Sequence, residues 1–209
     1  MEGTSPETPE GIAGMTLREL CEAASDTDIR LAAASVAAAC AAMGAALLSR
    51  ASCMFDPESA NNRDSACYRA RQLSAELQEL ATRLDAADEF VHSLGDKPGD
   101  TALSVAADAC LALLEASYFG QSLALQAAEG AKREGAMDLA GASMMLDAAA
   151  GSSLICASFY LAGITDPDAV RRSEELIWAI THDRVGAKKK VLDASDKLIR
   201  NQDLNILVK

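Results

Sequence analysis

Residues 73–94 read LSAELQELATRLDAADEFVHSL, and this stretch decides the fold class. Apolar residues recur in it at alternating spacings of four and three: Leu73, Leu77, Leu80, Leu84, Ala87, Val91 and Leu94. Such spacing places every member on one stripe of an α-helix. The stretch therefore predicts a long helix that packs along its whole length against other helices.

The composition of the whole chain also favours helices. Half of the 209 residues are hydrophobic, yet only 4% are aromatic, and alanine supplies much of the apolar fraction. Alanine is the strongest helix former, and its small side chain lets helices approach closely. The alternation of apolar and polar residues that is typical of strands is absent from the sequence. We expect an all-α protein.

Capping residues and breaks divide the chain into predicted helices at about residues 16–25, 31–53, 57–94, 101–129, 137–161 and 167–201. The first begins with a capping box, in which Thr16 is the N-cap and Glu19 follows three residues later. Two others begin with aspartate as N-cap and proline as the first helical residue, at Asp56-Pro57 and Asp166-Pro167.

Short connections between long helices indicate an antiparallel up-and-down bundle of about four long helices and two short ones. The clearest breaks are residues 95–100, which contain glycine and proline, and the polar segment 129–135. Without an internal linker, residues 15–209 are predicted to form one domain after a disordered tail at 1–14. The alanine-rich faces leave apolar surface that a second copy can cover, which predicts a homodimer.

Two stretches without a charged residue, 31–48 and 148–165, raise the question of a membrane span. Alanine, serine and glycine dominate both stretches, and neither has an aromatic belt or a basic flank. The composition favours helices buried by neighbouring helices and a partner subunit, and we expect no membrane association.

Charge and cysteine usage limit the partners and the compartment. The formal net charge of −12 argues against nucleic-acid binding, because phosphate contacts need a basic surface. The N-terminal residues have no basic segment followed by an apolar one, so we expect no secretory signal and a cytoplasmic location. The six cysteines are scattered without a CxxC pair, and we expect buried, reduced thiols.

One possible metal motif is the E-x-x-H formed by Glu89 and His92. Di-iron bundles use this motif twice, but the residue three before His182 is Ala179. Two histidines are also too few for most zinc sites, so we expect no metal. A nucleophile elbow, a phosphate loop and a dinucleotide fingerprint are all absent from the sequence.

Asp138 and two nearby cations are the site candidates that the residues themselves offer. Asp138 lies at the start of a sparsely charged helix, where it either offsets the helix dipole or faces a ligand as an acid. Lys132 and Arg133 lie in the break before that helix. They belong either to a solvated face or to a pocket for an anionic ligand.

The order of these features resembles the cyclodeaminase/cyclohydrolase family. This is the folate-handling domain of formiminotransferase-cyclodeaminase and of stand-alone methenyltetrahydrofolate cyclohydrolases. The resemblance rests on SVAAACAAMGAAL at 35–47 and DLAGASMMLDAAAGSSLICASFYL at 138–161, and it extends from about Met15 to Asn201. It implies a dimeric antiparallel bundle with a folate site near the subunit interface. It also implies reactions in which a tetrahydrofolate derivative is the substrate and no cofactor is needed.

The start of the second helix departs from the family's pattern. Where the family has a proline, three glycines and a serine, this chain has Leu31, Ala32, Ala33, Ala34 and Ser35, so only the serine is kept. Glycine permits a close approach of ligand to backbone, whereas alanine favours helix. We therefore expect the alanines to extend the helix toward Leu31 and to narrow or close the folate pocket.

The same resemblance assigns roles to the candidate site residues. The family's serine–aspartate pair before the fifth helix is Met137-Asp138 here, which implies that Asp138 is the catalytic acid or base. Ser35 and the three alanines before it would line the substrate pocket. Lys132 and Arg133 are candidates for binding an anionic substrate because of their charge, not because of the resemblance. The family's lysine-rich segment after the second helix is absent.

Two functions therefore remain open. The first is an enzyme of one-carbon folate metabolism, either a cyclohydrolase or a cyclodeaminase. The second is a non-catalytic dimeric relative that binds a different ligand or a partner protein.

Overall fold

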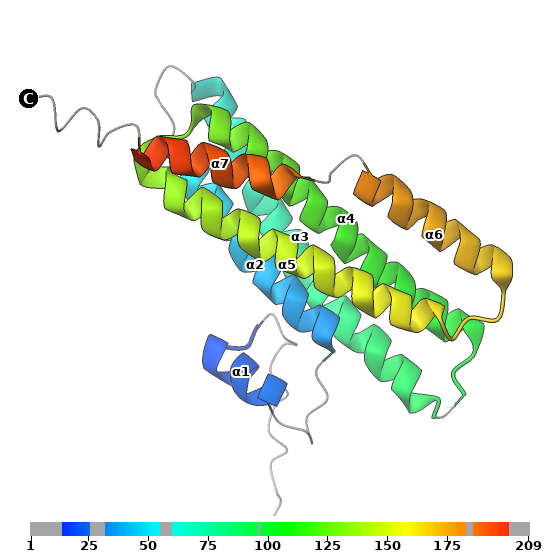
Figure 1. Cartoon of the computed structure of the whole chain (residues 1–209). Coiled ribbons are helices and arrows are strands. Elements are labelled where there is room, and N and C mark those ends of the chain that lie inside the picture. Colours follow the sequence, from blue (N-terminus) through cyan, green and yellow to red (C-terminus); the bar gives the residue numbers. More distant parts are fainter. Residues whose placement is uncertain (1–13, 26–31, 55–59, 96, 183–185, 201–209) are drawn as a thin grey trace, which may run out of the picture.

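Seven α-helices and no strand make up the parts of the chain that the computed structural model describes, which are residues 14–25, 32–54, 60–95, 97–182 and 186–200 (Figure 1). The helices are α1 (Leu17–Ser25), α2 (Ala33–Ser52), α3 (Ala60–Ser93), α4 (Asp100–Gly130), α5 (Arg133–Leu161), α6 (Pro167–His182) and α7 (Ala187–Arg200). The all-α prediction is confirmed. The predicted tail at 1–14 and the Asp56-Pro57 helix start lie almost wholly outside the described residues.

Helices α2 to α5 lie side by side as an antiparallel bundle around one hydrophobic core (Figure 1). The heptad stripe of α3 faces this core, as predicted: Leu73, Leu77, Leu80, Leu84, Ala87 and Val91 are buried. Leu94 is exposed, because α3 ends at Ser93. α7 packs on α4 and α5, while α6 lies along α4 (Figure 1).

Close packing between α2 and α5 depends on a glycine. A Cβ atom at Gly44 would lie 3.0 Å from the Cβ of Met145 and 3.2 Å from the carbonyl oxygen of Ala142. Both of these atoms are fixed by the backbone of α5, so neither can move aside without moving the helix. Gly44 therefore sets the distance between the two helices.

A buried polar pair joins α4 to α5. The Gln121 amide donates a hydrogen bond of 2.5 Å to the carbonyl oxygen of Ser143 and accepts one of 2.7 Å from the Ser143 hydroxyl. Buried polar groups of this kind are costly unless paired, so the two side chains fix the register between the helices.

Two predicted boundaries are wrong. The single helix predicted at 167–201 is two helices, because α6 ends at His182 and Gly186 adopts a φ of +95°, which a helix cannot continue through. The break predicted at 129–135 is shorter, since α5 begins at Arg133 with Lys132 as its N-cap. The capping box is confirmed: Glu19 and Thr16 exchange hydrogen bonds of 2.6 and 3.3 Å.

Three helices, α2, α4 and α5, are long and apolar enough to cross a membrane by length and composition. The sequence prediction identified the stretches in α2 and α5 and missed α4. In the fold all three contribute to the shared core, which gives their apolar residues a protein environment.

The prediction that the cysteines are buried holds for part of the set. Cys67 and Cys110 are buried, and Cys40 and Cys156 are half-buried. Cys21 and Cys53 are exposed, which corrects the prediction for these two. Their positions on the short helix α1 and at the C-terminal cap of α2 leave them outside the core.

Gly44→Ala tests the close packing of α2 on α5. We expect it to lower the free energy of unfolding by about 2 kcal/mol, because the new methyl group overpacks a fixed backbone. Gly151→Ala is the control, since a Cβ there meets nothing within 4 Å, and it should be neutral or stabilising. Urea unfolding of both variants measures the difference, and equal stabilities would disprove the role given to Gly44.

Candidate functional site

The predicted site residues fall at opposite ends of α2. Ser35 and the alanines before it lie at its N-terminus, whereas Arg50 near its C-terminus contacts Asp138. Fifteen residues separate Ser35 from Arg50, which is about 22 Å along a helix axis. Within one chain the structure therefore does not bring Ser35 and Asp138 into one pocket.

Asp138 forms a bidentate ion pair at this far end. Its Oδ2 accepts a hydrogen bond of 2.6 Å from Arg50 Nε, and its Oδ1 accepts another from Arg50 Nη2. The Asp138 side chain is largely buried, whereas Arg50 is exposed. Because both carboxylate oxygens are engaged, Asp138 transfers a proton only if the guanidinium moves.

Lys132 and Arg133 share the Asp138 end of the bundle. Lys132 is the exposed N-cap residue of α5, and Arg133 is its half-buried first helical residue. Their predicted contact with a substrate remains a prediction, and in one chain such a substrate would not reach Ser35.

The N-terminus of α2 has the conformation that its alanines favour. Ala32 is the N-cap with extended backbone, and Ala33 and Ala34 are helical. Ala32 and Ala34 are buried, while Ala33 is exposed. The expected helical extension is thus confirmed for Ala33 and Ala34 and wrong for Ala32, and Leu31 lies outside the described residues.

Ser35 is the residue kept from the family's pattern, and its hydroxyl is fully buried. Among the described residues, this oxygen has no hydrogen-bond partner. A buried hydroxyl without a partner costs about 1–3 kcal/mol, so such groups need an explanation. The hydroxyls of Ser117 and Ser195 are in the same state, so the Ser35 hydroxyl by itself indicates no ligand.

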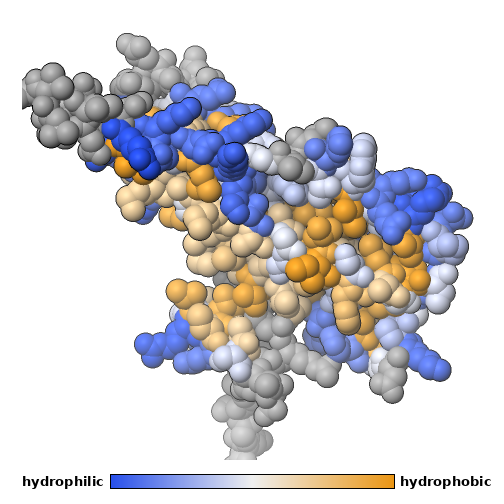
Figure 2. All heavy atoms as spheres, viewed as in Figure 1, coloured by the Kyte–Doolittle hydropathy of each residue, from blue (hydrophilic) through white to orange (hydrophobic). Residues whose placement is uncertain are grey.

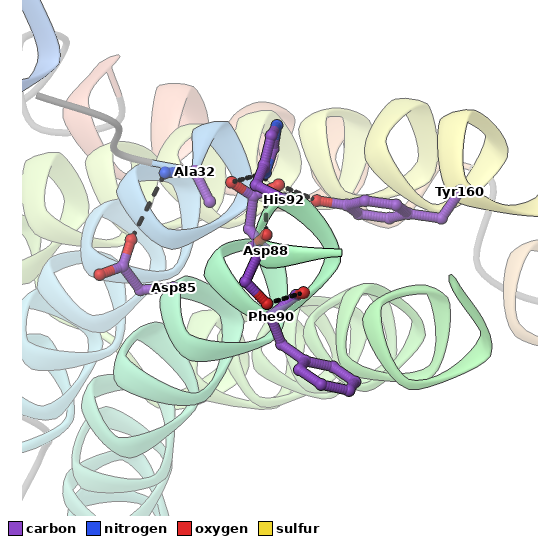
Figure 3. Close-up of polar contacts among 7 residues, drawn as sticks. Ala32, Asp85, Asp88, Phe90, His92 and Tyr160 are labelled. Atoms are coloured by element: carbon purple, nitrogen blue, oxygen red, sulfur yellow. Dashed lines mark hydrogen bonds and ion pairs between the residues drawn. The ribbon is translucent and has the colours of Figure 1, made fainter. Parts of the chain in front are cut away.

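Asp85 of α3 faces the start of α2 (Figure 3). Its Oδ1 lies 3.5 Å from the backbone nitrogen of Ala32, which donates to it. Burial raises the pKa of Asp85, and the nearby carboxylates of Asp88 and Glu89 raise it further, while the contact with Ala32 lowers it. The net pKa is above the ordinary aspartate value, which suits a group that exchanges a proton.

One turn farther along α3, Asp88 lies between Tyr160 and His92 (Figure 3). The Tyr160 hydroxyl donates to Asp88 Oδ1. His92 Nδ1 lies 2.8 Å from the Asp88 carbonyl oxygen and 3.2 Å from Oδ2. Both partners are acceptors, so Nδ1 carries the proton and Nε2 is the basic nitrogen of the ring.

Tyr160 holds this carboxylate from α5. Burial raises the pKa of Tyr160 strongly, and its hydrogen bond to Asp88 raises it further. The phenol therefore stays protonated and donates at neutral pH. The Asp88 carboxylate is fixed by the phenol and lies 3.2 Å from His92 Nδ1, while the Asp88 carbonyl oxygen accepts the hydrogen bond that orients the imidazole. An imidazole held beside a carboxylate in this way resembles an aspartate–histidine dyad for general base catalysis.

A cleft of about 760 Å³ opens beside the dyad, between the ends of α3, α4 and α5. Its lining residues are Val91, His92, Gly95, Lys97, Pro98, Leu103, Phe159, Ala162 and Gly163. The Phe159 ring is 74% exposed, and Lys97 adds a positive charge. The cleft thus offers an aromatic face, a cation and a base to a ligand.

Hydrogen bonds to Asp100 hold one wall of the cleft. Its carboxylate accepts three, from the backbone nitrogen and hydroxyl of Thr165 and from the backbone nitrogen of Asp166, at 2.8–3.1 Å. The contacts with Thr165 lower the pKa of Asp100, so it stays ionised. The turn after α5, which includes Ala162 and Gly163, is thereby tied to the start of α4.

The sequence prediction singled out His92 for a different reason. It considered Glu89 and His92 as a metal motif, but the partner of His92 is Asp88, four residues earlier on the same face. Among the described residues no group of three or more His, Cys, Asp and Glu could hold a metal ion. The i, i+4 spacing of Asp88 and His92 was a signal that could have identified the pair.

Comparison with known proteins identifies the fold. No family model matches the sequence, and no curated protein matches it. Among solved structures, the formiminotetrahydrofolate cyclodeaminase from Thermotoga maritima superposes with a TM-score of 0.82 at 16% sequence identity. The match covers 88% of this chain and 98% of that one. At this identity the likeness establishes a shared helical fold.

Asp85→Asn tests the raised pKa of this carboxyl group. The folded state binds the Asp85 proton more tightly than the unfolded state, so ionisation destabilises the fold above the raised pKa. We expect Asp85→Asn to be more stable than the parent at pH 7 and to lose this advantage as the pH falls below the ordinary aspartate pKa. Asp108→Asn, at an exposed position of α4, is the control.

Unfolding in urea at several pH values between 3 and 7 measures the effect. An advantage of Asp85→Asn that does not change with pH would contradict the assignment, because a packing effect is independent of ionisation.

Proposed function

We propose that this chain is an enzyme of one-carbon folate metabolism that binds a tetrahydrofolate derivative in the cleft beside His92. The observation that carries the proposal is the Asp88–His92 dyad at the edge of a cleft with an aromatic face. The likeness of the fold to a formiminotetrahydrofolate cyclodeaminase supports it. The tetrahydrofolate derivative is the substrate, and the proposal requires no metal or other cofactor.

The lining of the cleft suits the parts of a folate. Phe159 presents an exposed ring on which the flat pterin can stack. Lys97 can pair with a carboxylate of the glutamyl tail, which matters in a chain of net charge −12. The start of α2 adjoins Asp85, whose Oδ1 accepts a hydrogen bond from the backbone nitrogen of Ala32, and the buried Ser35 hydroxyl is not part of the cleft lining.

The dyad supplies the acid–base chemistry that either reaction needs. In a cyclohydrolase, His92 Nε2 takes a proton from water as the water oxygen attacks the methenyl carbon. It then gives that proton to the leaving nitrogen as the carbon–nitrogen bond breaks, while the remaining hydroxyl proton is released to solvent and its oxygen becomes the formyl oxygen. In a cyclodeaminase, the same nitrogen takes the proton of the attacking substrate amine and delivers it to the departing ammonia. Asp88 stabilises the imidazolium formed in between.

Asp138 keeps the role that the resemblance implies, as a second candidate for the acid or base. In one chain it serves a different pocket from His92, because it lies at the other end of α2. Lys132 and Arg133 would then bind the anionic part of the substrate beside it.

The exposed apolar face of α5 supports the proposal of a homodimer. Met137, Met144 and Ile155 are between 58% and 76% exposed and lie along α5. Figure 2 shows hydrophobic side chains gathered along α5 and α2 on this side of the molecule. We propose that a second copy covers this face, because two-fold packing lets the same apolar patch serve both partners.

The proposed function also implies a soluble protein in the cytoplasm that acts on a dissolved substrate. The high negative charge and the shared core suit a soluble cytoplasmic protein, in which α2, α4 and α5 are bundle helices and not membrane spans.

The alternative is a non-catalytic relative that binds another ligand or a partner protein. It is favoured by the buried Ala32 and Ala34, which occupy the helix start that the resemblance assigns to the folate loop. It is also favoured by the ion pair that occupies Asp138. Ligand binding without turnover, or co-purification with one partner protein, would support this alternative.

His92→Gln tests the enzyme proposal. We expect the loss of methenyl absorbance from 5,10-methenyltetrahydrofolate to slow by at least about 100-fold, because the general base is removed. His182→Gln is the matched control, since the other histidine lies on α6, stacked on Trp178. Turnover at the wild-type rate in His92→Gln would show that another group is the base.

Ile155→Glu tests the proposed dimer. We expect the wild-type protein to sediment at twice the chain mass of 21.8 kDa and the variant at the mass of one chain, because the charge cannot be buried in an apolar contact. Trp178→Glu, which changes an exposed residue of α6, should leave the mass unchanged. A wild-type protein that sediments as a single chain would exclude the dimer.

A further inference from the structure

Two cysteine side chains meet where the end of α2 packs against α3. The sulfur atoms of Cys53 and Cys67 lie 2.7 Å apart. Cys53 is the C-terminal cap residue of α2, and Cys67 belongs to α3. A disulfide bond is about 2.05 Å long, so the two sulfurs need to approach by roughly 0.7 Å to bond.

The surroundings of the pair suit an oxidisable thiol. Cys53 is exposed and can meet a reagent from solvent, whereas Cys67 behind it is buried. The Ser49 hydroxyl lies 3.4 Å from the Cys67 sulfur and accepts a hydrogen bond of 3.3 Å from Arg71 Nε. The Arg71 guanidinium is thus linked to the Cys67 sulfur through the Ser49 hydroxyl, and positive charge near a thiol favours the reactive thiolate.

None of the other cysteines among the described residues combines exposure to solvent with a neighbouring sulfur atom. Cys110 is buried, and burial raises its pKa to about 12, so it stays a thiol. Cys156 is half-buried, and burial raises its pKa as well. Cys40 is half-buried on α2. Cys21 is exposed on α1, where no contact with another sulfur is seen within the described residues.

We propose that Cys53 and Cys67 are a redox modification site, which a peroxide converts into an intramolecular disulfide. The Cys53 sulfur attacks one oxygen of hydrogen peroxide, forming an S–O bond as the O–O bond breaks, and the other oxygen leaves as water. The Cys67 sulfur then attacks the Cys53 sulfur, forming the S–S bond as the S–O bond breaks, and a second water leaves. The two thiols lose two electrons and two protons, and the peroxide is reduced to two waters.

The disulfide would join α2 to α3 near the Asp138 end of the bundle. It closes a short loop, since the two cysteines are 14 residues apart, and it constrains the unfolded chain. The disulfide would also fix the end of α2 to α3 at Cys53. This position is three residues after Arg50, whose guanidinium binds Asp138 of α5. Oxidation should therefore stabilise the fold and restrict motion at this end of the molecule.

Mass spectrometry of the native protein after treatment with hydrogen peroxide tests the proposal. We expect the chain to lose about 2 Da, and peptide mapping to place the cross-link between Cys53 and Cys67. The melting temperature should rise by about 5 °C and return to its starting value after reduction with dithiothreitol.

Cys53→Ser and Cys67→Ser should both abolish the cross-link and the rise in melting temperature. Cys21→Ser is the matched control, because it removes an exposed thiol and should leave both unchanged. If Cys53 is oxidised without a cross-link, or pairs with a cysteine of another molecule, the proposal is wrong. If either serine variant fails to fold, counting free thiols after the oxidised wild-type protein is unfolded without reductant still decides, because two of the six must disappear.

Discussion

The contact between α2 and α5 at Gly44 is the constraint on which the rest of the structure depends. It lets a nearly uncharged helix lie against its neighbour at a distance that no larger residue permits. Because the contact at Gly44 fixes the position of α2 against α5, it also fixes which side chains surround each end of α2. Its N-terminus meets Asp85 of α3, and its C-terminus meets Asp138 of α5. The polar features discussed as candidate sites all lie near one of these two ends.

The sequence allowed the fold class and most helices to be predicted, because heptad spacing and caps are local signals. The stripe from Leu73 to Val91 is buried as expected. The division of the last helix was missed, because Gly186 looks like an ordinary helix glycine until its φ is known. The grouping of site residues was also missed: sequence order does not reveal that Ser35 and Asp138 lie at opposite ends of α2.

The alanines at the start of α2, where the family that the sequence resembles has glycines, have two consequences that oppose each other. Alanine lets α2 begin at Ala33 and buries Ala34, which fills space that a ligand could use. The same helix start leaves the Ser35 hydroxyl buried without a partner among the described residues. Asp85 lies beside this helix start, and farther along α3 His92 lines the open cleft with Asp88 next to it. The candidate acid–base groups are therefore concentrated on α3, while the alanines at the start of α2 occupy space next to Asp85.

The central claim is that the folate site lies at the His92 end of the bundle. A crystal structure of the protein with folinic acid, which carries the same pterin and a stable formyl group, tests it most directly. The account predicts the pterin in the cleft against Phe159, with the formyl group within hydrogen-bond distance of His92. A pterin bound beside Arg50 and Asp138, or a protein that binds no folinic acid, would contradict it.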